Sequence, residues 1–427
     1  MAKQVFMKTI IPGDRGILVQ YLQLALTRAG YVTRTDGIFG PATCRILNSF
    51  LGAETNCTVT QEVWNRLIPY LRGYTKHTVV NGDTLWQIAG MHRTQVDHIL
   101  RANPGIDPNR LIPGTILYVP FSFPLVPTNV PYTSVLTTYL LEGMAVRYPF
   151  LTVEPIGGSV MGRSILGMRI GTGEKEVFYN ASFHANESIT TPLLLKFAED
   201  YAQAYAAGGQ FLGVDAEWLY QEYELNLVPL VNPDGVDLVN GLLTEGVYYE
   251  QAQKIAADYP QIPFPSGWKA NINGVDLNLQ FPAGWENAKA TKFAQGYTSP
   301  APRDYVGEAP LTEPESRAVA EFTKSRDFQL ILAYHTQGEV IYWKYLNYNP
   351  VHSREIADYF ASVSGYAVEE TPIVSGYAGY KDWFIMTYDR PGYTIEAGLG
   401  QNPLPMSQFG QIYQDNRGIL LGGMTQI

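Results

Sequence analysis

The sequence predicts an α/β protein whose last two thirds form a mixed sheet with helices on both faces. Three apolar stretches, 177–183, 225–230 and 330–334, have the length and continuity of buried strands. They are separated by longer stretches with helical periodicity, chiefly 192–206 and 313–324. Strands that alternate with helices along a chain are typical of a sheet packed between helices.

The composition predicts a folded chain with more than one domain. The chain has 427 residues, with 46% apolar and 16% charged residues. Its formal charge of −10 argues against nucleic acid or an anionic membrane surface as the main partner. No apolar run reaches the ~18 residues of a membrane-spanning helix, so we expect no membrane insertion.

The start of the chain and the cysteines bear on the compartment. Residues 1–10 lack the apolar core of a secretory signal, so we expect none. Cys44 and Cys57 are the only cysteines, too few for a disulfide framework. A single bridge between them is an open alternative, but we expect none in a protein without an export signal.

Residues 1–74 are expected to form a small helical domain. A turn at 12–16 precedes a stretch, 17–30, with helical apolar periodicity and a glycine at its end. The loop at 35–43 contains D-G-I-F-G-P-A-T and leads into a new helix. This loop resembles the D-G-x-F-G-x-x-T loop of peptidoglycan-binding domains, which implies wall binding. The alternative is a helical bundle that only packs against the rest of the protein.

Residues 75–120 are expected to form a second small domain with strand–helix–helix–strand order. The stretch 79–89 contains a strand, a turn and a capped helix start, and 99–104 and 112–120 supply a second helix and a closing strand. With its G-D-T-L-W and N-P motifs this unit resembles a LysM domain, which implies binding to N-acetylglucosamine polymers. The residues expected to contact glycan are Asp83, Thr84, Asn103 and Pro104.

A linker and the main domain follow. Residues 121–132 contain three prolines and few charges, which is typical of a semi-rigid linker or of a strap over the next domain. The main domain is expected to span 133–427 and to begin with a helix near 138–148. Further strands are expected near 151–153 and 164–170.

A histidine and a glutamate of the main domain have metal-ligand spacing. His184 and Glu187 are three positions apart, just after the strand-like run. A catalytic zinc takes three protein ligands and keeps one position open, so a third ligand must come from elsewhere. Alone, such a pair is weak evidence of a metal site, because surface pairs with this spacing arise by chance.

The third ligand is expected to be His335, which ends a buried apolar run. Open α/β sheets place ligand chemistry at the carboxyl ends of their strands. His352 follows a turn-like segment and ranks below His335. Glu396 lies near the end of another strand-like segment, where a carboxylate could exchange protons with water during zinc hydrolysis.

Several motifs in order resemble the zinc carboxypeptidase family, the M14 metallopeptidases, over the last two thirds of the chain. Besides H-x-x-E they are 232–235 (N-P-D-G), 274–278 (G-V-D-L-N), 313–315 (E-P-E) and 394–396 (T-I-E). The resemblance implies a zinc-carboxypeptidase-like fold with one Zn²⁺. It also implies His184, Glu187 and His335 as zinc ligands and Glu396 as the general base that takes a proton from the zinc-activated water.

The residues expected to bind substrate depart from those of exopeptidases in this family. Asn278 remains, but Leu279 replaces the arginine that grips the C-terminal carboxylate of the substrate. Asn186 stands where digestive members carry another arginine, and Lys269 is the only cation where an oxyanion-stabilising arginine is expected. Simple removal of a C-terminal amino acid is therefore in doubt.

Two wall-binding domains before a zinc peptidase resemble the bacterial γ-D-glutamyl-L-diamino acid endopeptidases. The resemblance implies cleavage of peptidoglycan stem peptides between γ-D-glutamate and meso-diaminopimelate or lysine, with glycan strands as a second partner. The alternatives are a general metallocarboxypeptidase and an inactive wall-binding scaffold. A wall substrate without an export signal implies action in the cytoplasm, in a sporulating mother cell or forespore, or after lysis.

A carboxylate-bearing substrate needs a cation, and the sequence offers several. The candidates are Arg163, Arg169, Lys269, Arg303 and Arg390. Members of this family often close a tyrosine over the site, and the candidates here are Tyr377 and Tyr380.

Overall fold

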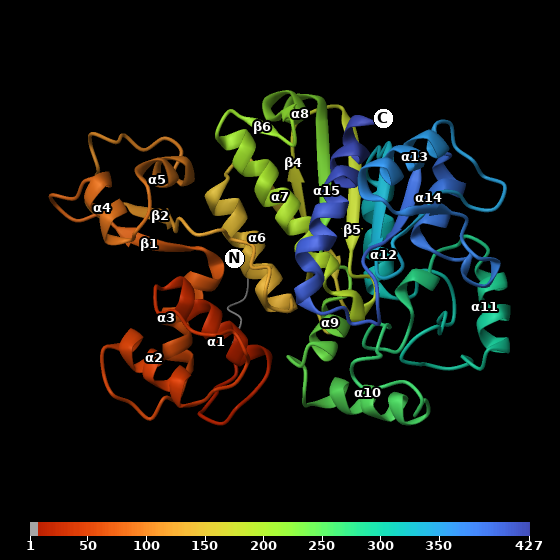
Figure 1. Ribbon diagram of the computed structural model, residues 1–427, viewed down its shortest axis with the longest axis horizontal. Coiled ribbons are helices and arrows are strands. Elements are labelled where there is room, and N and C mark those ends of the chain that lie inside the picture. The colour runs from red at the N-terminus through yellow and green to blue at the C-terminus, as the bar shows by residue number, and fades with distance from the viewer. Residues whose placement is uncertain (1–6) are drawn as a thin grey trace. The chain divides into compact units, whose positions relative to one another are not determined.

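The computed structural model describes residues 7–427 and divides into two compact units (Figure 1). One unit comprises the chain up to Val130 together with Val135–Thr152, and the other comprises Pro131–Ser134 and Val153–Ile427. Residues 1–6, which carry most of the stretch expected to lack a signal core, lie outside the described residues. Among the described residues, no helix combines the length and the hydropathy needed to cross a bilayer.

Three helices form the first module of the amino-terminal unit: α1 (Ile17–Arg28), α2 (Pro41–Leu51) and α3 (Gln61–Arg72). Gly52 and Gly73 follow α2 and α3 with φ of 74° and 84°, left-handed values that glycine adopts without steric cost. Leu22, Leu47 and Trp64, one from each helix, are fully buried. The apolar faces of the three helices thus pack together in one small core. We call this three-helix unit the helical module.

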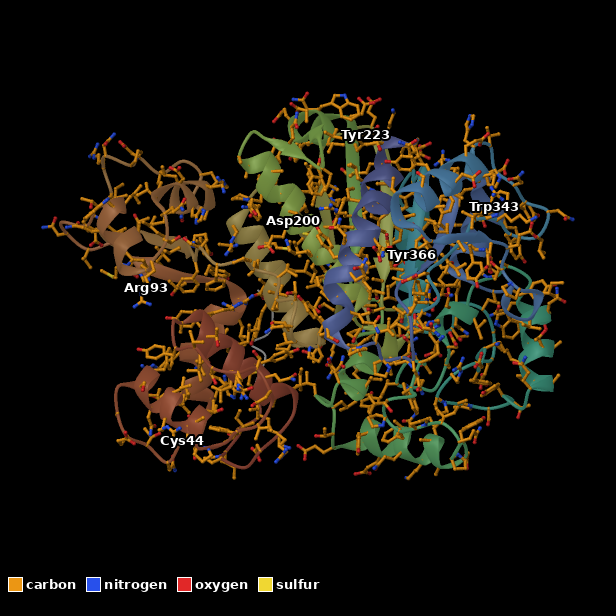
Figure 2. All side chains as sticks on the ribbon, in the orientation of Figure 1. Cys44, Arg93, Asp200, Tyr223, Trp343 and Tyr366 are labelled. Carbon is orange, nitrogen blue, oxygen red and sulfur yellow. A yellow bond between two sulfur atoms is a disulfide. The ribbon has the colours of Figure 1, made fainter. Side chains whose placement is uncertain are left out.

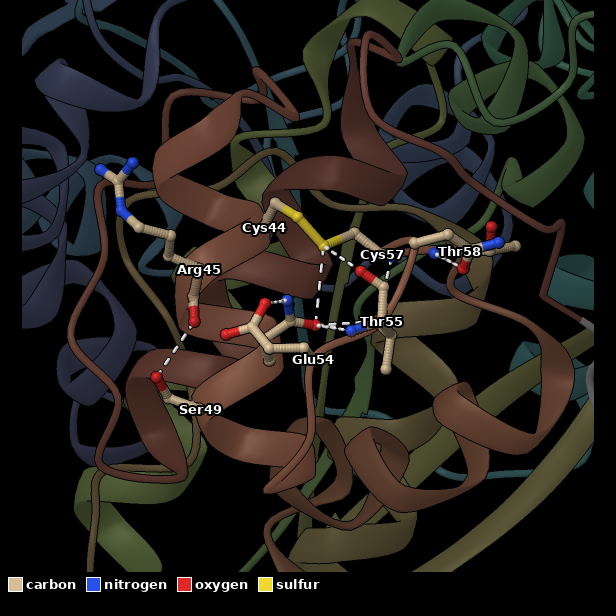
Figure 3. Close-up of a disulfide and its surroundings, with 9 residues drawn as sticks. Cys44, Arg45, Ser49, Glu54, Thr55, Cys57 and Thr58 are labelled. Carbon is tan, nitrogen blue, oxygen red and sulfur yellow. Dashed lines mark hydrogen bonds between the residues drawn. A yellow bond between two sulfur atoms is a disulfide. The ribbon is translucent and has the colours of Figure 1, made fainter.

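Cys44 and Cys57 form a disulfide (Figure 3), where we expected reduced cysteines. That expectation depended on the compartment alone, whereas the fold brings the two Cα atoms to 5.5 Å, within the range of about 4.4–6.8 Å that disulfides span. Asn48 holds the same loop, because its side-chain oxygen accepts hydrogen bonds from the backbone N and the hydroxyl of Thr55 at 3.1 and 2.7 Å. The bridge therefore closes a loop that is also hydrogen-bonded to α2.

The second module has the predicted strand–helix–helix–strand order. Its elements are β1 (Tyr74–Thr78), α4 (Leu85–Met91), α5 (Val96–Ala102) and β2 (Ile116–Pro120), and β1 pairs with β2 antiparallel. Thr84 caps α4 in a capping box with Gln87. Ile88, Ile99 and Val119 are fully buried and close the core between the helices and the strand pair.

The stretch expected as a linker packs on the amino-terminal unit. Leu125 and Val130 are fully buried, and Phe121 donates its backbone N–H to the Gly73 carbonyl at 3.0 Å. Helix α6 (Ser134–Arg147) follows, and most of it belongs to the same unit. These residues are too apolar for a solvated linker, so they form a strap over the unit before them.

An eight-stranded mixed sheet forms the centre of the second unit. Its strands are β3 (Thr152–Gly158), β4 (Ser164–Ile170), β5 (Lys175–Ala181), β8 (Tyr223–Val228), β9 (Leu330–His335), β10 (Val340–Tyr342), β11 (Ala367–Glu369) and β12 (Gly392–Glu396). They lie in the order β11-β10-β12-β9-β5-β8-β4-β3. The central strands β12, β9, β5 and β8 are parallel, and β4 and β10 run antiparallel to β8 and β12. The mixed sheet predicted from the sequence is confirmed.

Helices cover both faces of this sheet, as predicted. On one face lie α7 (Thr190–Ala206), α13 (Ser353–Ser364) and α15 (Phe409–Thr425), and on the other α12 (Pro314–Lys324) and α14 (Tyr380–Tyr388). The hydroxyl of Tyr179 in β5 donates to the Leu420 carbonyl in α15 at 2.8 Å. Its neighbour Phe178 packs on the opposite face with Val319 and Phe384. Consecutive strand residues are thus buried on both sides.

Shorter elements complete the unit. They are the β6 (Gln210–Phe211) and β7 (Val214–Asp215) pair, the helices α8 (Ala216–Glu222), α9 (Pro233–Val239), α10 (Val247–Ala257) and α11 (Trp285–Ala294), and the 3₁₀ turns η1 (Ala185–Glu187), η2 (Leu277–Leu279), η3 (Ile373–Ser375) and η4 (Met406–Gln408). Turns η1 and η2 carry residues of the candidate site.

Candidate metal centre

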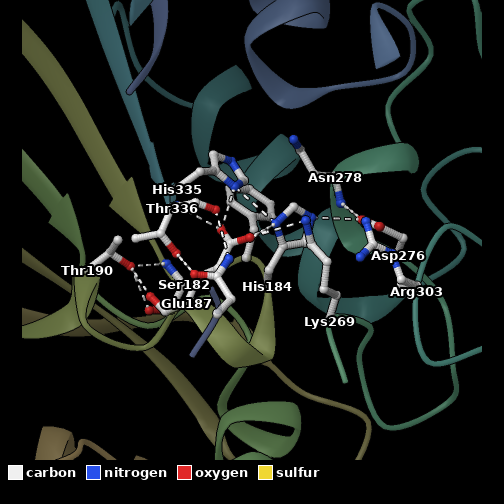
Figure 4. Close-up of polar contacts among 12 residues, drawn as sticks. Ser182, His184, Glu187, Thr190, Lys269, Asp276, Asn278, Arg303, His335 and Thr336 are labelled. Atoms are coloured by element: carbon white, nitrogen blue, oxygen red, sulfur yellow. Dashed lines mark hydrogen bonds and ion pairs between the residues drawn. The ribbon is translucent and has the colours of Figure 1, made fainter. Parts of the chain in front are cut away.

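Three parallel strands, β5, β9 and β12, bring the candidate residues together at the carboxyl-terminal ends of the strands. His335 is the last residue of β9 and Glu396 the last of β12, and the two are direct partners in the strand register. His184 and Glu187 follow the end of β5, with Glu187 on η1 (Figure 4). Because parallel strands end at a common edge, residues 148 positions apart in sequence meet here.

His184, Glu187 and His335 form a compact, buried cluster. Nδ1 of His184 lies 2.9 Å from Glu187 Oε1, Nδ1 of His335 lies 3.0 Å from Glu187 Oε2, and the two Nδ1 atoms are 3.1 Å apart. One ligand atom from each residue lies within 4.8 Å of the others. Two imidazole nitrogens and a carboxylate are a donor set that zinc accepts, so these residues fit a zinc ion.

Asp276 supports the cluster from behind. Its Oδ1 lies 3.0 Å from Nε2 of His184, the ring nitrogen that points away from Glu187. A carboxylate at this position fixes the ring orientation and leaves Nδ1 as the metal-facing atom. Asp276 belongs to the G-V-D-L-N motif at 274–278, but the motif itself does not indicate this contact with His184.

Charge interactions outweigh burial at two members of the cluster. Burial alone would lower the pKa of His184, but the Glu187 carboxylate raises that pKa to about 9. Burial would raise the pKa of Glu187, yet His184 and Lys269 hold it well below its usual value. Burial lowers the pKa of His335. Protons and a metal ion compete for the same nitrogens, so metal binding must weaken as the pH falls.

Asn232 ties together the three loops around the cluster. Its amide nitrogen donates to the carbonyls of Phe183 and Ala270 at 3.1 and 3.0 Å, and its oxygen accepts from the Gly235 N–H at 3.0 Å. The last bond caps α9. The segment that carries His184 is therefore fixed by a buried side chain outside the metal site.

One cavity of about 240 Å³ is lined by five of the predicted site residues, namely His184, His335, Glu396, Asn278 and Lys269. Glu396 is partly exposed to the cavity, and burial together with the nearby Glu187 carboxylate raises its pKa to about 8. Lys269 Nζ lies 3.2 Å from Glu187 Oε1, which raises the pKa of Lys269 against the effect of burial.

Arg163 does not line this cavity, and substrate binding by Arg163 stays a prediction. Its guanidinium pairs with the buried carboxylates of Asp234 and Asp237 at 2.6 and 3.1 Å. Arg169 and Arg390 also form ion pairs elsewhere. Of the five candidate cations only Lys269 and Arg303 line the cavity.

Two further lysines line the cavity that the sequence analysis did not single out. Lys292 pairs with Asp304 at 2.5 Å. Lys381 pairs with Asp382 at 2.8 Å and donates to the Lys344 carbonyl at 2.7 Å. Lys292 lies on α11 and Lys381 on α14, and the sequence predicted neither of these helices nor their approach to the cavity.

Neither candidate tyrosine lines the cavity. Tyr380 is fully buried, and its hydroxyl lies 2.9 Å from the hydroxyl of Thr323. Tyr377 packs beside Gly284 and Trp285. His352, the alternative ligand, is an exposed residue at the start of α13.

The predicted glycan-binding residues lie in the second module, where several already have internal partners. Asp83 accepts a hydrogen bond from the Val80 N–H at 2.8 Å, and Thr84 caps α4. Asn103 is buried, donates to the Ile99 carbonyl at 2.7 Å and accepts from the Tyr118 N–H at 2.8 Å. Glycan contact by these residues and by Pro104 stays a prediction.

Comparison with known proteins identifies two families. Residues 137–417 match the zinc carboxypeptidase family (Peptidase_M14), and residues 77–120 match the LysM domain. A Lysinibacillus sphaericus protein named gamma-D-glutamyl-L-diamino acid endopeptidase 1 is 48% identical over 66% of this chain and 70% of its own length. A Bacillus subtilis (strain 168) protein named uncharacterized protein YqgT is 44% identical over 64% of this chain and 72% of its own. Carboxypeptidase A from Helicoverpa armigera has the same fold, with a TM-score of 0.53 and 20% identity over 69% of this chain and 73% of that one.

Proposed function

This chain belongs to the zinc carboxypeptidase (M14) family and is a zinc metallopeptidase, and from that premise we propose that it cleaves peptidoglycan stem peptides. The proposed bond joins γ-D-glutamate to the diamino acid, meso-diaminopimelate or lysine. The similarity to a relative named for this activity supports the choice, and the family match at 137–417 contains every residue of the candidate centre.

One observation in the cavity carries the proposal against a general carboxypeptidase. Leu279 lines the cavity beside Asn278, and its side chain packs against Trp285 and Val306. An apolar residue so placed cannot grip a terminal carboxylate as an arginine would. The cavity instead carries its cations at other positions, so a substrate with a differently placed carboxylate fits it better.

Arg303 is the cation best placed to bind that carboxylate. Its Nε pairs with Asp304 at 2.5 Å, and its side chain is 43% exposed. The pair holds the guanidinium in place, and the two terminal nitrogens remain to donate to a carboxylate in the fork geometry that arginine favours. We assign to Arg303 the α-carboxylate of D-glutamate, which a γ-linkage leaves free.

The catalytic steps follow from the positions of the other residues. His184, Glu187 and His335 would hold the zinc ion, which supplies the Lewis acid for amide hydrolysis. Glu396 takes the proton of the attacking water and returns it to the leaving amine. Lys269 donates to the oxygen that becomes negative in the tetrahedral intermediate. Asn278 accepts from the Tyr380 N–H at 3.0 Å, so its NH₂ group is the end that donates to substrate.

The amino-terminal unit would bind the wall polymer that carries these peptides. The LysM match supports binding to glycan strands. For the helical module the support is its D-G-x-F-G-x-x-T loop, which precedes α2. The proposed place of action is therefore cell-wall material, with glycan held by one unit and stem peptide cut by the other.

Hydrolysis of L-Ala-γ-D-Glu-meso-diaminopimelate tests the proposal. We expect release of diaminopimelate that stops on addition of a chelator and returns with zinc. An N-blocked dipeptide with an ordinary α-linkage should be a poor substrate. Equal turnover of the α-linked dipeptide would favour a general carboxypeptidase, and no turnover of either would favour an inactive scaffold.

A pair of variants tests the role of Arg303. Arg303→Gln should raise KM for the γ-linked tripeptide at least about tenfold, the scale of one charge-assisted hydrogen bond. Arg390→Gln is the matched control, because Arg390 pairs with Asp327 and does not line the cavity. An unchanged KM in Arg303→Gln would assign the substrate carboxylate to another cation.

A further inference from the structure

A second groove, of about 710 Å³, lies within the amino-terminal unit. It is lined by residues of the helical module, of the LysM module and of the strap that starts at Phe121. Its volume falls in the range of roughly 300–1,000 Å³ that is typical of ligand sites. None of the four predicted glycan-binding residues lines it, so it is distinct from the site expected in the LysM module.

The walls of this groove are fixed to one another. Gly73 alone separates α3 from β1, and a side chain there would clash with Leu125 of the strap. Arg28, from α1, donates through Nη2 to the Leu125 carbonyl at 2.6 Å, and its guanidinium lies over the Phe123 ring at 4.8 Å. A groove held in this way is preformed, so a ligand would lose little affinity to the ordering of its walls.

Aromatic rings form a continuous row along the groove. Phe121 stacks on Tyr70 with centroids 4.9 Å apart and on Phe123 with centroids 5.4 Å apart. Phe50 meets Tyr70 edge-on at 6.1 Å, and Tyr31 meets Phe50 edge-on at 5.8 Å. Tyr31 at the outer end of the row is 37% exposed. Phe121 is buried between its neighbours, whereas Tyr31, Phe50, Tyr70 and Phe123 keep exposed surface on which the C–H faces of sugar rings can pack.

The charges along the groove are all of one sign. Arg28, Arg66 and Arg93 line it together with His92, and none of its lining residues is acidic, although the chain carries a net charge of −10. Arg66 and Arg93 are exposed. Arg93 belongs to the α4–α5 connection (Figure 2). Its guanidinium lies against Gly30 of the helical module, where the first side-chain carbon of any other residue would be only 2.7 Å from Nη1.

Both exposed arginines act on the centre of the aromatic row. Burial raises the pKa of Tyr70, and the positive charges of Arg93 and Arg66 oppose that shift. Both guanidinium groups line the same groove as Tyr70, and that of Arg66 lies over the Phe50 ring at 5.2 Å. A ligand over this ring would meet apolar surface and positive charge together.

We propose that this groove binds an acidic glycopeptide, namely a segment of peptidoglycan strand whose stem peptides carry free carboxylates. The sugar rings pack on the aromatic row, and the carboxylates accept hydrogen bonds from Arg66 and Arg93. The proposal rests on the proposed function for the identity of the polymer, while the groove chemistry sets the class. A neutral N-acetylglucosamine polymer would bring no negative charge to either guanidinium group, and a ring-free polyanion would not use the aromatic row.

Binding by the full-length protein tests the proposal. The probes are solubilised peptidoglycan strands with intact stem peptides, the same strands with their carboxylates amidated, a chitin oligomer and inorganic polyphosphate. Arg66→Gln/Arg93→Gln should weaken binding to the acidic strands at least about tenfold. The matched control is Arg45→Gln/Arg110→Gln, which removes the same charge from exposed arginines outside the groove. The groove variant and the control should bind the chitin oligomer and the amidated strands equally well.

The aromatic row has its own variant pair. Tyr31→Ala should weaken strand binding several-fold, whereas Val32→Ala, a change at the exposed neighbour outside the groove, should not. Equal binding of acidic strands by the groove variant and its control would overturn the proposal. So would tight polyphosphate binding that Tyr31→Ala leaves unchanged, because charge alone would then explain the groove. Cleavage of the soluble tripeptide is measured in parallel, so a failure of the proposed enzymatic activity is seen separately from a failure of this groove.

Discussion

At the residue scale, Glu187 joins the two imidazoles of the candidate centre. Its Oε1 faces His184 Nδ1 and Lys269 Nζ, and its Oε2 faces His335 Nδ1 and accepts from the Thr336 N–H at 3.2 Å. A buried carboxylate needs such partners, because desolvation of an unpaired charge is costly. The same contacts hold the histidine nitrogens at the positions from which they can bind a metal ion.

His335→Ala should abolish both zinc retention and turnover. It removes one of three ligand atoms and leaves a two-ligand site that binds zinc weakly. Zinc content by atomic absorption after dialysis measures the effect. His352→Ala is the control, because the His352 side chain is 74% exposed at the start of α13. Wild-type zinc content in His335→Ala, with loss in His352→Ala, would reverse our assignment.

Glu396→Gln should reduce kcat by about 10²–10⁴-fold and leave zinc content and KM nearly unchanged. The amide keeps the shape of the side chain but cannot accept a proton from water. Steady-state kinetics on the tripeptide measure the effect. A change confined to KM would instead make Glu396 a residue that binds ground state and transition state equally.

The pH dependence of stability gives a second readout for Glu396. The pKa of Glu396 is about 8 in the folded chain, against a usual value of 4.5. Between pH 4.5 and about pH 8 the Glu396 carboxyl is therefore protonated in the folded chain and ionised in the unfolded chain. The folded state then binds more protons, so this group lowers the free energy of unfolding as the pH rises through that interval. With chelator present, Glu396→Gln should therefore melt higher than wild type above pH 8 and at about the same temperature at pH 4.5. A lower melting temperature above pH 8 would mean that ionised Glu396 forms a stabilising ion pair.

At the element scale, strand ends supply the ligands and short turns supply their support. The sequence predicted His335 and Glu396 at the ends of β9 and β12 because apolar runs mark buried strands. It could not predict that Arg163 pairs with Asp234, or that Lys292 reaches the cavity. Asp234 and Lys292 lie on the short helices α9 and α11, and the place where such a helix packs depends on tertiary contacts that its own sequence does not reveal.

Asn232→Ala should lower the free energy of unfolding by about 2–4 kcal/mol, because it removes a helix cap and leaves two buried carbonyls unpaired. Urea denaturation measures the loss. Asp215→Ala is the matched control: Asp215 caps α8 through one bond to the Trp218 N–H, is exposed, and should cost about 1 kcal/mol. Equal losses would show that Asn232 acts only as a cap.

At the scale of the whole molecule, the two units carry different chemistry. Every residue of the candidate centre belongs to the second unit, while the LysM module and the aromatic groove belong to the first. The sequence predicted the modules from their motifs. It did not predict the disulfide, because the expected compartment does not report how close two cysteines lie in the fold. It did not predict the packing of the strap, because proline content does not report tertiary contacts.

A chain that begins at residue 131 should still cleave the soluble tripeptide, because no residue of the candidate centre is lost. It should bind insoluble peptidoglycan about 10²-fold or more weakly, since two sites on one polymer reinforce each other only while they are linked. Sedimentation with purified wall and tripeptide kinetics measure the two effects. Full-length Glu396→Gln is the reciprocal control, which should bind wall normally and fail to cleave. A truncated chain that is folded by circular dichroism yet no longer cleaves the tripeptide would mean that the first unit helps to build the active site.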